Sequence, residues 1–278
     1  MKVRSRFCLK SVEKKLLVAA VLSLFFAVAP TRGQVSLSLS RGAGYAMQRD
    51  LGVSPISYQG LAGRMGLGVD VRLPRWSIEI DRGTLAALYE SGTFGEDGNS
   101  MGYGISSCQE VCALRQMWTH GRWLLMAGPM LSSNLALKLN PELFNASFGL
   151  SGFASLSLKG RICFDFGRED EDYRHYRFRF YGQQTLSPMT LAVRPGYSYI
   201  DNYSGTTDQL SAFLETYELM ALAAAEWHSE LGVKMQMPSG NRIGLAYRWD
   251  YCTTYNAGAW RFDEAFHMAV ASFDFILK

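Results

Sequence analysis

Residues 242–255 read RIGLAYRWDYCTTY, and the side chains alternate between two kinds from one position to the next. One set is apolar or aromatic and comprises Ile243, Leu245, Tyr247, Trp249, Tyr251 and Tyr255. The other set is charged or hydroxylated and comprises Arg242, Arg248, Asp250 and Thr254. A repeat of two residues is typical of a β-strand with two unlike faces. The segment therefore predicts a strand with apolar surroundings on one side and polar surroundings on the other.

The segment before it has the same repeat. Trp227, Leu231, Val233, Met235 and Met237 alternate with Glu226, His228, Glu230, Lys234 and Gln236. Between the two segments lies Pro238-Ser239-Gly240-Asn241, which has the composition of a tight turn. Together the two segments predict an antiparallel hairpin with one apolar and one charged face.

Residues 35–48, 61–73 and 76–88 repeat this alternation, with Arg41 the only charge on the apolar side of the first of them. A strand that faces lipid on one side and a lumen on the other must change polarity at every residue. The pattern predicts an all-β fold, a closed antiparallel transmembrane β-barrel. Alternation alone also allows a soluble exported β-sandwich or a lipid-binding barrel, because an apolar face can meet a second sheet instead of lipid.

The number of strands depends on whether Lys159-Gly160-Arg161 is a turn. Phe148, Leu150, Ala154, Leu156, Leu158, Ile162, Phe164 and Phe166 keep one parity straight through this tripeptide, so we interpret it as part of one long strand. A turn there would give twelve strands instead. The predicted ten strands span residues 34–48, 60–73, 76–91, 104–119, 122–138, 146–166, 175–199, 218–237, 241–255 and 264–277.

The predicted connections alternate in length. Those at 74–75, 120–121 and 238–241 are short, and those at 49–59, 92–103, 200–217 and 256–263 are longer. With both chain ends in the periplasm, the longer loops would lie outside the cell. The charged segment 168–174 is the exception, since this count places it on the periplasmic side.

Two segments fit the pattern poorly. Residues 105–117 alternate weakly, and residues 206–225 also fit a helix, with Leu210, Phe213, Leu214, Tyr217 and Met220 at helical spacing. A short loop helix that runs into the eighth strand near Tyr217 would satisfy both interpretations of the second segment.

Residues 1–33 have the composition of a cleaved signal peptide, with a basic start and an apolar run from Leu16 to Ala29, which leaves residues 34–278 as the barrel. An uncleaved anchor is the alternative. Beyond residue 33 no run of eighteen apolar residues occurs, as a spanning helix would need. The net charge of +3 is too small to indicate a nucleic-acid partner. Cys108, Cys112, Cys163 and Cys252 are widely spaced, which argues against a disulfide scaffold.

Three parts of the chain resemble a known family: LGVSPISYQG at residues 51–60, the segments PMTL (188–191) and GYSYID (196–201), and the C-terminal hairpin. They are similar to an uncharacterised family of predicted outer-membrane β-barrels of Bacteroidetes type. The resemblance implies a barrel in the bacterial outer membrane and brings no known activity, ligand or catalytic residue.

The alternation places many charged side chains in the lumen: Arg64, Asp70, Arg72, Glu79, Asp81, Lys159, Arg161, Asp165, Arg177, Arg179, Glu226, His228, Glu230, Lys234, Arg242, Arg248 and Asp250. Acids and bases are nearly balanced, and buried charges need partners. We therefore expect an ion-pair network that fills the lumen.

Glu226, His228 and Glu230 are the best candidates for acid–base chemistry, since alternate positions on a strand share one face. Ser229 would point the opposite way, so no nucleophile accompanies His228. We expect no catalytic, cofactor-binding or metal site.

The sequence thus predicts a monomeric outer-membrane barrel that contacts lipid and no nucleic acid. Its expected role is structural or surface-interacting, through extracellular loops and with a partner that the sequence does not indicate. A narrow solute channel is the first alternative, and an outer-membrane lipid hydrolase, which would make the protein an enzyme, is the second.

Overall fold

A computed structural model gives the structure of residues 33–51, 54–94, 98–141, 148–166, 177–195, 217–222, 224–255 and 261–277. The predicted signal peptide lies outside these residues except for Gly33. Within the same ranges, no helix is long and apolar enough to cross a membrane.

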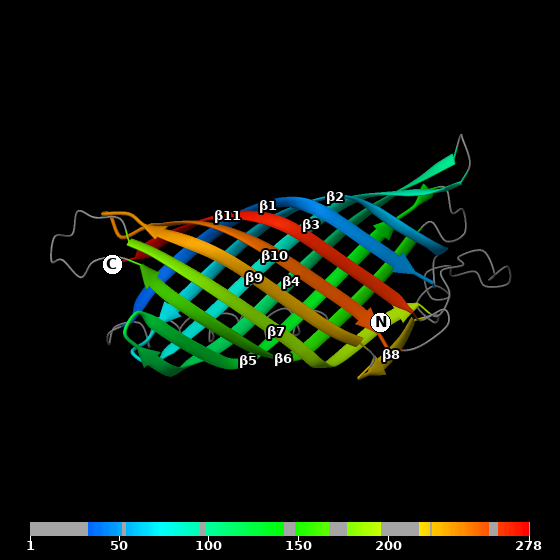
Figure 1. Cartoon of the computed structure of the whole chain (residues 1–278). Coiled ribbons are helices and arrows are strands. Elements are labelled where there is room, and N and C mark those ends of the chain that lie inside the picture. The colour runs from blue at the N-terminus through cyan, green and yellow to red at the C-terminus, as the bar shows by residue number, and fades with distance from the viewer. Residues whose placement is uncertain are drawn as a thin grey trace, which may run out of the picture.

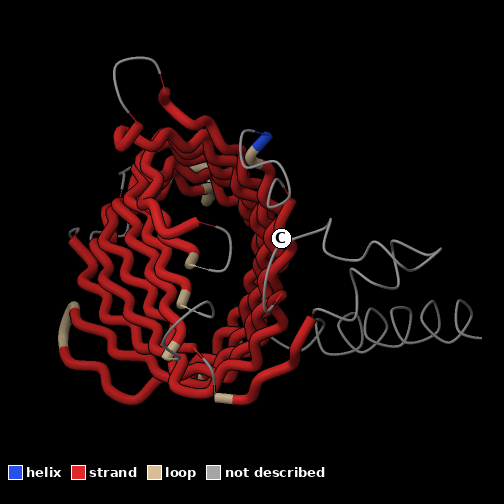
Figure 2. The backbone as a smooth tube through the Cα atoms, turned by 90° about the vertical axis from the view of Figure 1, so that its right-hand side faces the viewer, coloured by secondary structure: helices blue, strands red, loops and turns tan. Residues whose placement is uncertain are grey.

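The described chain is one antiparallel sheet that closes on itself (Figures 1 and 2). Consecutive strands pair in chain order except that β9 pairs with β7 and not with β8, and the pairing of β1 with β11 closes the ring. The strands are β1 (Gln34–Asp50), β2 (Ser54–Arg72), β3 (Trp76–Phe94), β4 (Gly98–His120), β5 (Trp123–Leu139), β6 (Phe148–Phe166), β7 (Arg177–Pro195), β8 (Tyr217–Ala221), β9 (Ala224–Gln236), β10 (Arg242–Thr254) and β11 (Phe262–Leu277).

The ring has ten strands, which confirms the predicted closed barrel, because β8 pairs only with β7 and does not extend the circle. The alternative of twelve strands is wrong. Lys159-Gly160-Arg161 lies within β6, where its backbone pairs with β5 on one side and β7 on the other.

The predicted eighth strand is interrupted. Leu222 has a φ of 55°, a left-handed conformation that is uncommon for a branched residue, and it separates β8 from β9. Residues 217–221 form a strand, and the part of the possible helix before Tyr217 lies outside the described residues.

The two ends of the barrel differ. We call the end where Gly33 and Leu277 lie the terminal end, on the left in Figure 1, and the other the far end. The predicted long loops at 49–59 and 92–103 are wrong, because β1 continues to Asp50 and β3 to Phe94, and β2 and β4 begin at Ser54 and Gly98. Outward-facing Gln59 and Glu90 interrupt the apolar pattern there, yet their backbones still pair. A sheet continues wherever its hydrogen-bonding groups find partners.

The apolar side chains face outward. Leu61, Leu158 and Leu245 are 70%, 68% and 60% exposed, while the charged side chains between them turn inward. The soluble alternatives are therefore wrong, because in them the apolar face would be covered. The weakly alternating segment 105–117 follows the same rule within β4: Glu110 and Cys112 are buried inside, while Gln109 and Arg115 point outward.

Tryptophans gather near the ends of the exterior. Trp76, Trp118 and Trp123 are 42–47% exposed next to the turns of the terminal end. Nearer the far end, the rings of Trp227 and Trp249 pack with centroids 5.7 Å apart. Aromatic rings in two such belts are typical of the interfaces between a membrane and water.

Candidate functional site

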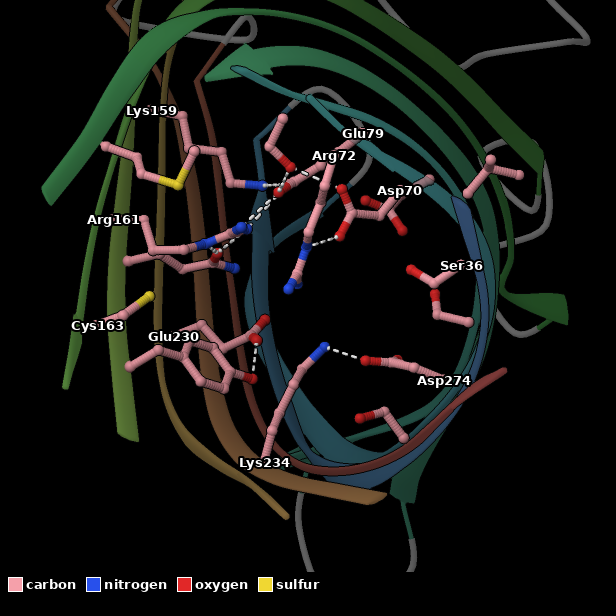
Figure 3. A pocket seen from close by; sticks show the side chains of 18 of the residues that line it. Ser36, Asp70, Arg72, Glu79, Lys159, Arg161, Cys163, Glu230, Lys234 and Asp274 are labelled. Carbon is pink, nitrogen blue, oxygen red and sulfur yellow. Dashed lines mark hydrogen bonds and ion pairs between the residues drawn. The ribbon is translucent and has the colours of Figure 1, made fainter. Parts of the chain in front are cut away.

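The terminal half of the lumen holds a cavity of about 380 Å³ with mainly polar walls. Figure 3 shows its charged wall and, opposite, Ser36 of β1. We call this space the vestibule. A volume of this size falls at the lower end of the range of small-molecule sites.

The charges along the vestibule are paired. The Lys159 Nζ donates a hydrogen bond of 2.9 Å to Glu79, and the Arg161 guanidinium donates to both oxygens of the same carboxylate (Figure 3). Arg161 also donates to the side-chain carbonyl of Gln183, at 2.7 Å. Although Lys159 is only 5% exposed, its charge therefore has a close partner.

Further pairs line the same space. The distances between the paired atoms are 2.8 Å for Arg72–Asp70, 2.8 Å for Lys234–Asp274 and 2.6 Å for Tyr181–Glu230. At the mouth, Arg179 pairs with Asp165, and Arg242 donates to the side-chain carbonyl of Gln34 at 3.3 Å.

Small residues of β1 and β2 form part of the opposite wall, which leaves the space open. The Oγ of Ser40 lies 2.4 Å from the position that a Cβ on Gly66 would take, and the Oγ of Ser38 lies 2.5 Å from that of a Cβ on Gly68. These serines thus lie against glycines of β2 instead of reaching into the lumen. The pattern Ser36-x-Ser38-x-Ser40 opens the vestibule on one side.

A charged layer crosses the middle of the lumen. Arg248 donates to Asp250 at 2.8 Å and to Glu110 at 3.2 Å, and His228 Nδ1 lies 2.7 Å from the Asp250 carboxylate. A second cavity of only about 50 Å³ adjoins this layer, and Arg64 and Arg248 line both cavities. These two guanidinium groups therefore lie between the two spaces.

The far half of the lumen is filled more completely. Arg194, 2% exposed, pairs with Asp50 at 2.5 Å, and its guanidinium carbon lies 4.5 Å from the ring centroid of Phe262. Lys138 approaches the same ring with its Nζ 3.9 Å from the centroid. The ring of Phe262 gives both cations a favourable electrostatic contact, although within the described part of the chain Arg194 Nε and Nη1 and Lys138 Nζ have no hydrogen-bond partner.

The charged residues predicted to face the lumen all lie on the inward parity of their strands. The structure brings Glu79 to Lys159 and Arg161, and His228 and Arg248 to Asp250. Glu226 instead accepts a hydrogen bond from Ser155 at 2.7 Å, apart from the layer around Arg248.

Among the residues that the structure describes, sequence reasoning missed six buried or half-buried charges in the lumen: Asp50, Glu110, Lys138, Arg194, Glu264 and Asp274. Asp50 falls within the predicted loop 49–59, and Glu110 lies in the segment with weak alternation. For Asp274 a signal was present, since it lies between the outward Phe273 and Phe275.

The histidines have different surroundings. Ser229 points outward, as predicted, and donates to Gln184 at 2.6 Å. His228 shares the lining of the 50 Å³ cavity with Ser106 and Cys108, which are inward residues of β4. His267 faces outward and is hydrogen-bonded to the Tyr247 hydroxyl, while His175 lies outside the described residues.

Cys108, Cys112, Cys163 and Cys252 are free thiols.

The sequence matches no protein-family model and no curated protein. The structure is similar to that of the outer membrane protease OmpT from Escherichia coli, with a TM-score of 0.51 over 90% of this chain and 98% of that one, at 8% identity. This likeness, with the closed ring and apolar exterior, decides the fold class. The chain is a bacterial outer-membrane β-barrel. The transport unit of the autotransporter AIDA-I from Escherichia coli is also similar, with a TM-score of 0.42 over 89% of this chain and 91% of that one, at 6% identity.

An outer-membrane barrel meets lipid across its apolar exterior, so the inward charges belong to its lumen and the strands cross the bilayer. At 8% identity the likeness to the protease concerns the fold of this barrel and not its activity.

Proposed function

We propose that this outer-membrane barrel has a structural or surface-interaction role, performed by its extracellular loops, and that its lumen does not conduct solutes. We further propose that it belongs with the uncharacterised barrels of Bacteroidetes type that its sequence resembles. In this proposal the protein is a monomer in contact with outer-membrane lipid, and the far end faces the cell exterior.

The observation that carries the proposal is the series of buried ion pairs that follow one another along the lumen. Glu110 and Asp250 are each 8% exposed in the middle layer, and Arg194 is 2% exposed in the far layer. Glu110 and Arg194 each pair with an opposite charge from another strand, and Asp250 pairs with Arg248 of its own strand and contacts His228 of β9. A solute would have to displace these pairs, and separating buried opposite charges costs several kcal/mol, about 3–5 for one pair.

Conductance in planar lipid bilayers tests this proposal. We expect the purified chain to insert without producing single-channel steps, after its folded state has been verified by heat-modifiable migration on a gel. Regular steps from the wild-type protein would contradict a closed lumen.

A narrow channel is the second candidate, and the shared lining of the two cavities supports it. Arg64 and Arg248 lie between the vestibule and the 50 Å³ cavity, so movement of two side chains would join these spaces. The double variant Arg64→Ala/Arg248→Ala is the matched probe. If the double variant produced conductance steps and the wild type did not, the wild-type lumen would be closed and the middle layer would be its barrier.

We also propose that the protein is not an enzyme. His228 and Asp250 form a pair that could activate a nucleophile, but the cavity that they share with Ser106 and Cys108 has about 50 Å³. That space accepts water molecules and is too small for a lipid ester. Release of fatty acid from phospholipid vesicles that is lost in His228→Ala would reverse this proposal in favour of the hydrolase alternative.

A further inference from the structure

The lipid-facing exterior carries a polar patch on neighbouring strands. Its members, which we call the outer polar patch, are Arg41 of β1, Arg82 and Thr84 of β3, Ser107 and Gln109 of β4, and Ser133 of β5. All are exposed except Ser107, which is half-buried. Most of the exterior around them is apolar, with Leu67 and Met65 of β2 63% and 55% exposed.

Strand register makes the patch continuous. One row across the sheet pairs Arg82 with Gln109 and Gln109 with Ser133. The adjacent outward row connects Arg41, Met65, Thr84 and Ser107. The two arginines thus flank β2, about 10 Å apart across the strands and offset by two residues along them.

The side chains of the patch face away from the lumen. Ser40 and Asp81, which precede the two arginines, line the vestibule, and Cβ atoms built on the following Gly42 and Gly83 would touch inward groups. Since side chains alternate along a strand, Arg41 and Arg82 point outward.

Some outward polar groups elsewhere on the barrel satisfy one another, and those of the patch do not. On β7 and β9, the Trp227 Nε1 and the Ser229 hydroxyl both donate to Gln184, at 2.7 and 2.6 Å. Among the described residues, no hydrogen bond or ion pair joins a side chain of the outer polar patch to any group. The patch therefore has two guanidinium groups without a carboxylate partner on a surface that faces lipid.

An arginine on the lipid face of a barrel destabilises the folded protein, and more strongly the nearer it lies to the midplane of the bilayer. Two of them beside three hydroxyls and an amide, without a carboxylate, require an anionic partner from the surroundings. Guanidinium groups bind phosphate in a fork geometry, and the neighbour of this surface is lipid. We propose that the outer polar patch binds the phosphate group of a membrane lipid, with Arg41 and Arg82 as its main ligands.

The proposal concerns the exterior and holds whether or not the lumen conducts. Its test compares thermal unfolding of the purified chain in micelles that contain phosphatidylglycerol or phosphatidylcholine, followed by the heat-modifiable gel shift. We expect phosphatidylglycerol to raise the midpoint of the wild type and not that of Arg41→Gln/Arg82→Gln. Native mass spectrometry should show roughly 30-fold weaker retention of the anionic lipid by this variant, since each arginine near a membrane surface contributes a factor of about five.

Arg49→Gln/Arg115→Gln is the matched control, because it removes two outward arginines from outside the patch; Arg115 lies over the ring of Trp76. This control should keep the response to phosphatidylglycerol. Equal loss in the control, or an unchanged response in Arg41→Gln/Arg82→Gln, would overturn the proposal. So would an equal rise in midpoint from inorganic phosphate in phosphatidylcholine, or a dimer that disappears in the patch variant, since these would indicate a free anion or a second copy.

Discussion

The two halves of the lumen contain the same kinds of charged side chain but differ in how completely they are filled. The terminal half keeps a vestibule of about 380 Å³, whereas the middle and far layers leave about 50 Å³ between them. The charges in the vestibule wall are hydrogen-bonded, while Arg194 and Lys138 in the far half depend on Asp50 and the ring of Phe262.

The difference follows from the serine and glycine residues in the vestibule wall on β1 and β2, and not from the charges. Along β11, the inward residues change from Asp274 and Ser272 near the terminal end to Met268, Phe266 and Phe262 toward the far end, with Glu264 between the two phenylalanines. Large apolar groups exclude water from the far half, so a charge there has only protein partners. Serine and glycine leave room for water in the vestibule, and the same ion pair should be less critical there.

The largest expected effect is in the far half. Asp50→Asn removes the negative charge that Arg194 Nη2 contacts and leaves a cation that is 2% exposed without its partner. We expect the free energy of unfolding to fall by about 4 kcal/mol. Urea titration in micelles, followed by tryptophan fluorescence, measures this change.

Asp263→Asn is the matched control, because it also removes an ion pair near the far end, but its partner Arg261 is 52% exposed. We expect a loss of about 0.5 kcal/mol for this exposed pair. If the two variants lost the same amount, the far half would be hydrated and the contrast between the two halves would fail.

The corresponding change in the vestibule is Glu79→Gln, which removes the shared partner of Lys159 and Arg161. Water in the cavity can solvate part of the remaining charge, so we expect a loss of about 2 kcal/mol in the same urea titration. Glu79→Gln/Lys159→Met should recover part of that loss by removing the excess cation. A loss as large as that of Asp50→Asn would mean that the vestibule is dry.

Much of the fold could be predicted from the sequence, because every spanning strand must face lipid with one parity. That requirement gives the parity of Arg161 and Lys159 and the continuity of β6 through Gly160. The requirement does not apply to those parts of the strands that extend beyond the bilayer. The strand extensions near Asp50 and Phe94 rest on backbone pairing alone, and their side chains carry no alternation that would reveal them.

The candidate site could be predicted only in part. Parity places Glu79 and Lys159 on the same inner surface, but they lie on β3 and β6, and which charges meet across a ring depends on the stagger of all the strands between them. Neighbouring strands of a hairpin are simpler. The approach of Arg248 and Asp250 to His228 follows from the turn at residues 238–241.

The role of these serine and glycine residues can be tested by adding a methyl group to one of the glycines. A Cβ added to Gly66 would lie 2.4 Å from the Ser40 hydroxyl, with the next heavy atom 3.7 Å away. We expect Gly66→Ala to lower the free energy of unfolding by about 1 kcal/mol, the smallest effect of the three, because only one short side chain must move.

Two further variants test whether the Ser40 hydroxyl causes the loss of stability in Gly66→Ala. Gly66→Ala/Ser40→Ala removes the hydroxyl and leaves the two methyl groups about as far apart as the 3.8 Å between the Ser40 Cβ and the added Cβ, so it should regain the wild-type value in the urea titration. Gly63→Ala lies on the same strand but faces outward, with nothing within 4 Å of its added Cβ, and should change little. If Gly66→Ala were as mild as Gly63→Ala, the contact between serine and glycine would not define the wall. The vestibule would then remain open because its charges hold the opposite wall in place, and Glu79→Gln, not Gly66→Ala, would be the variant that changes its volume.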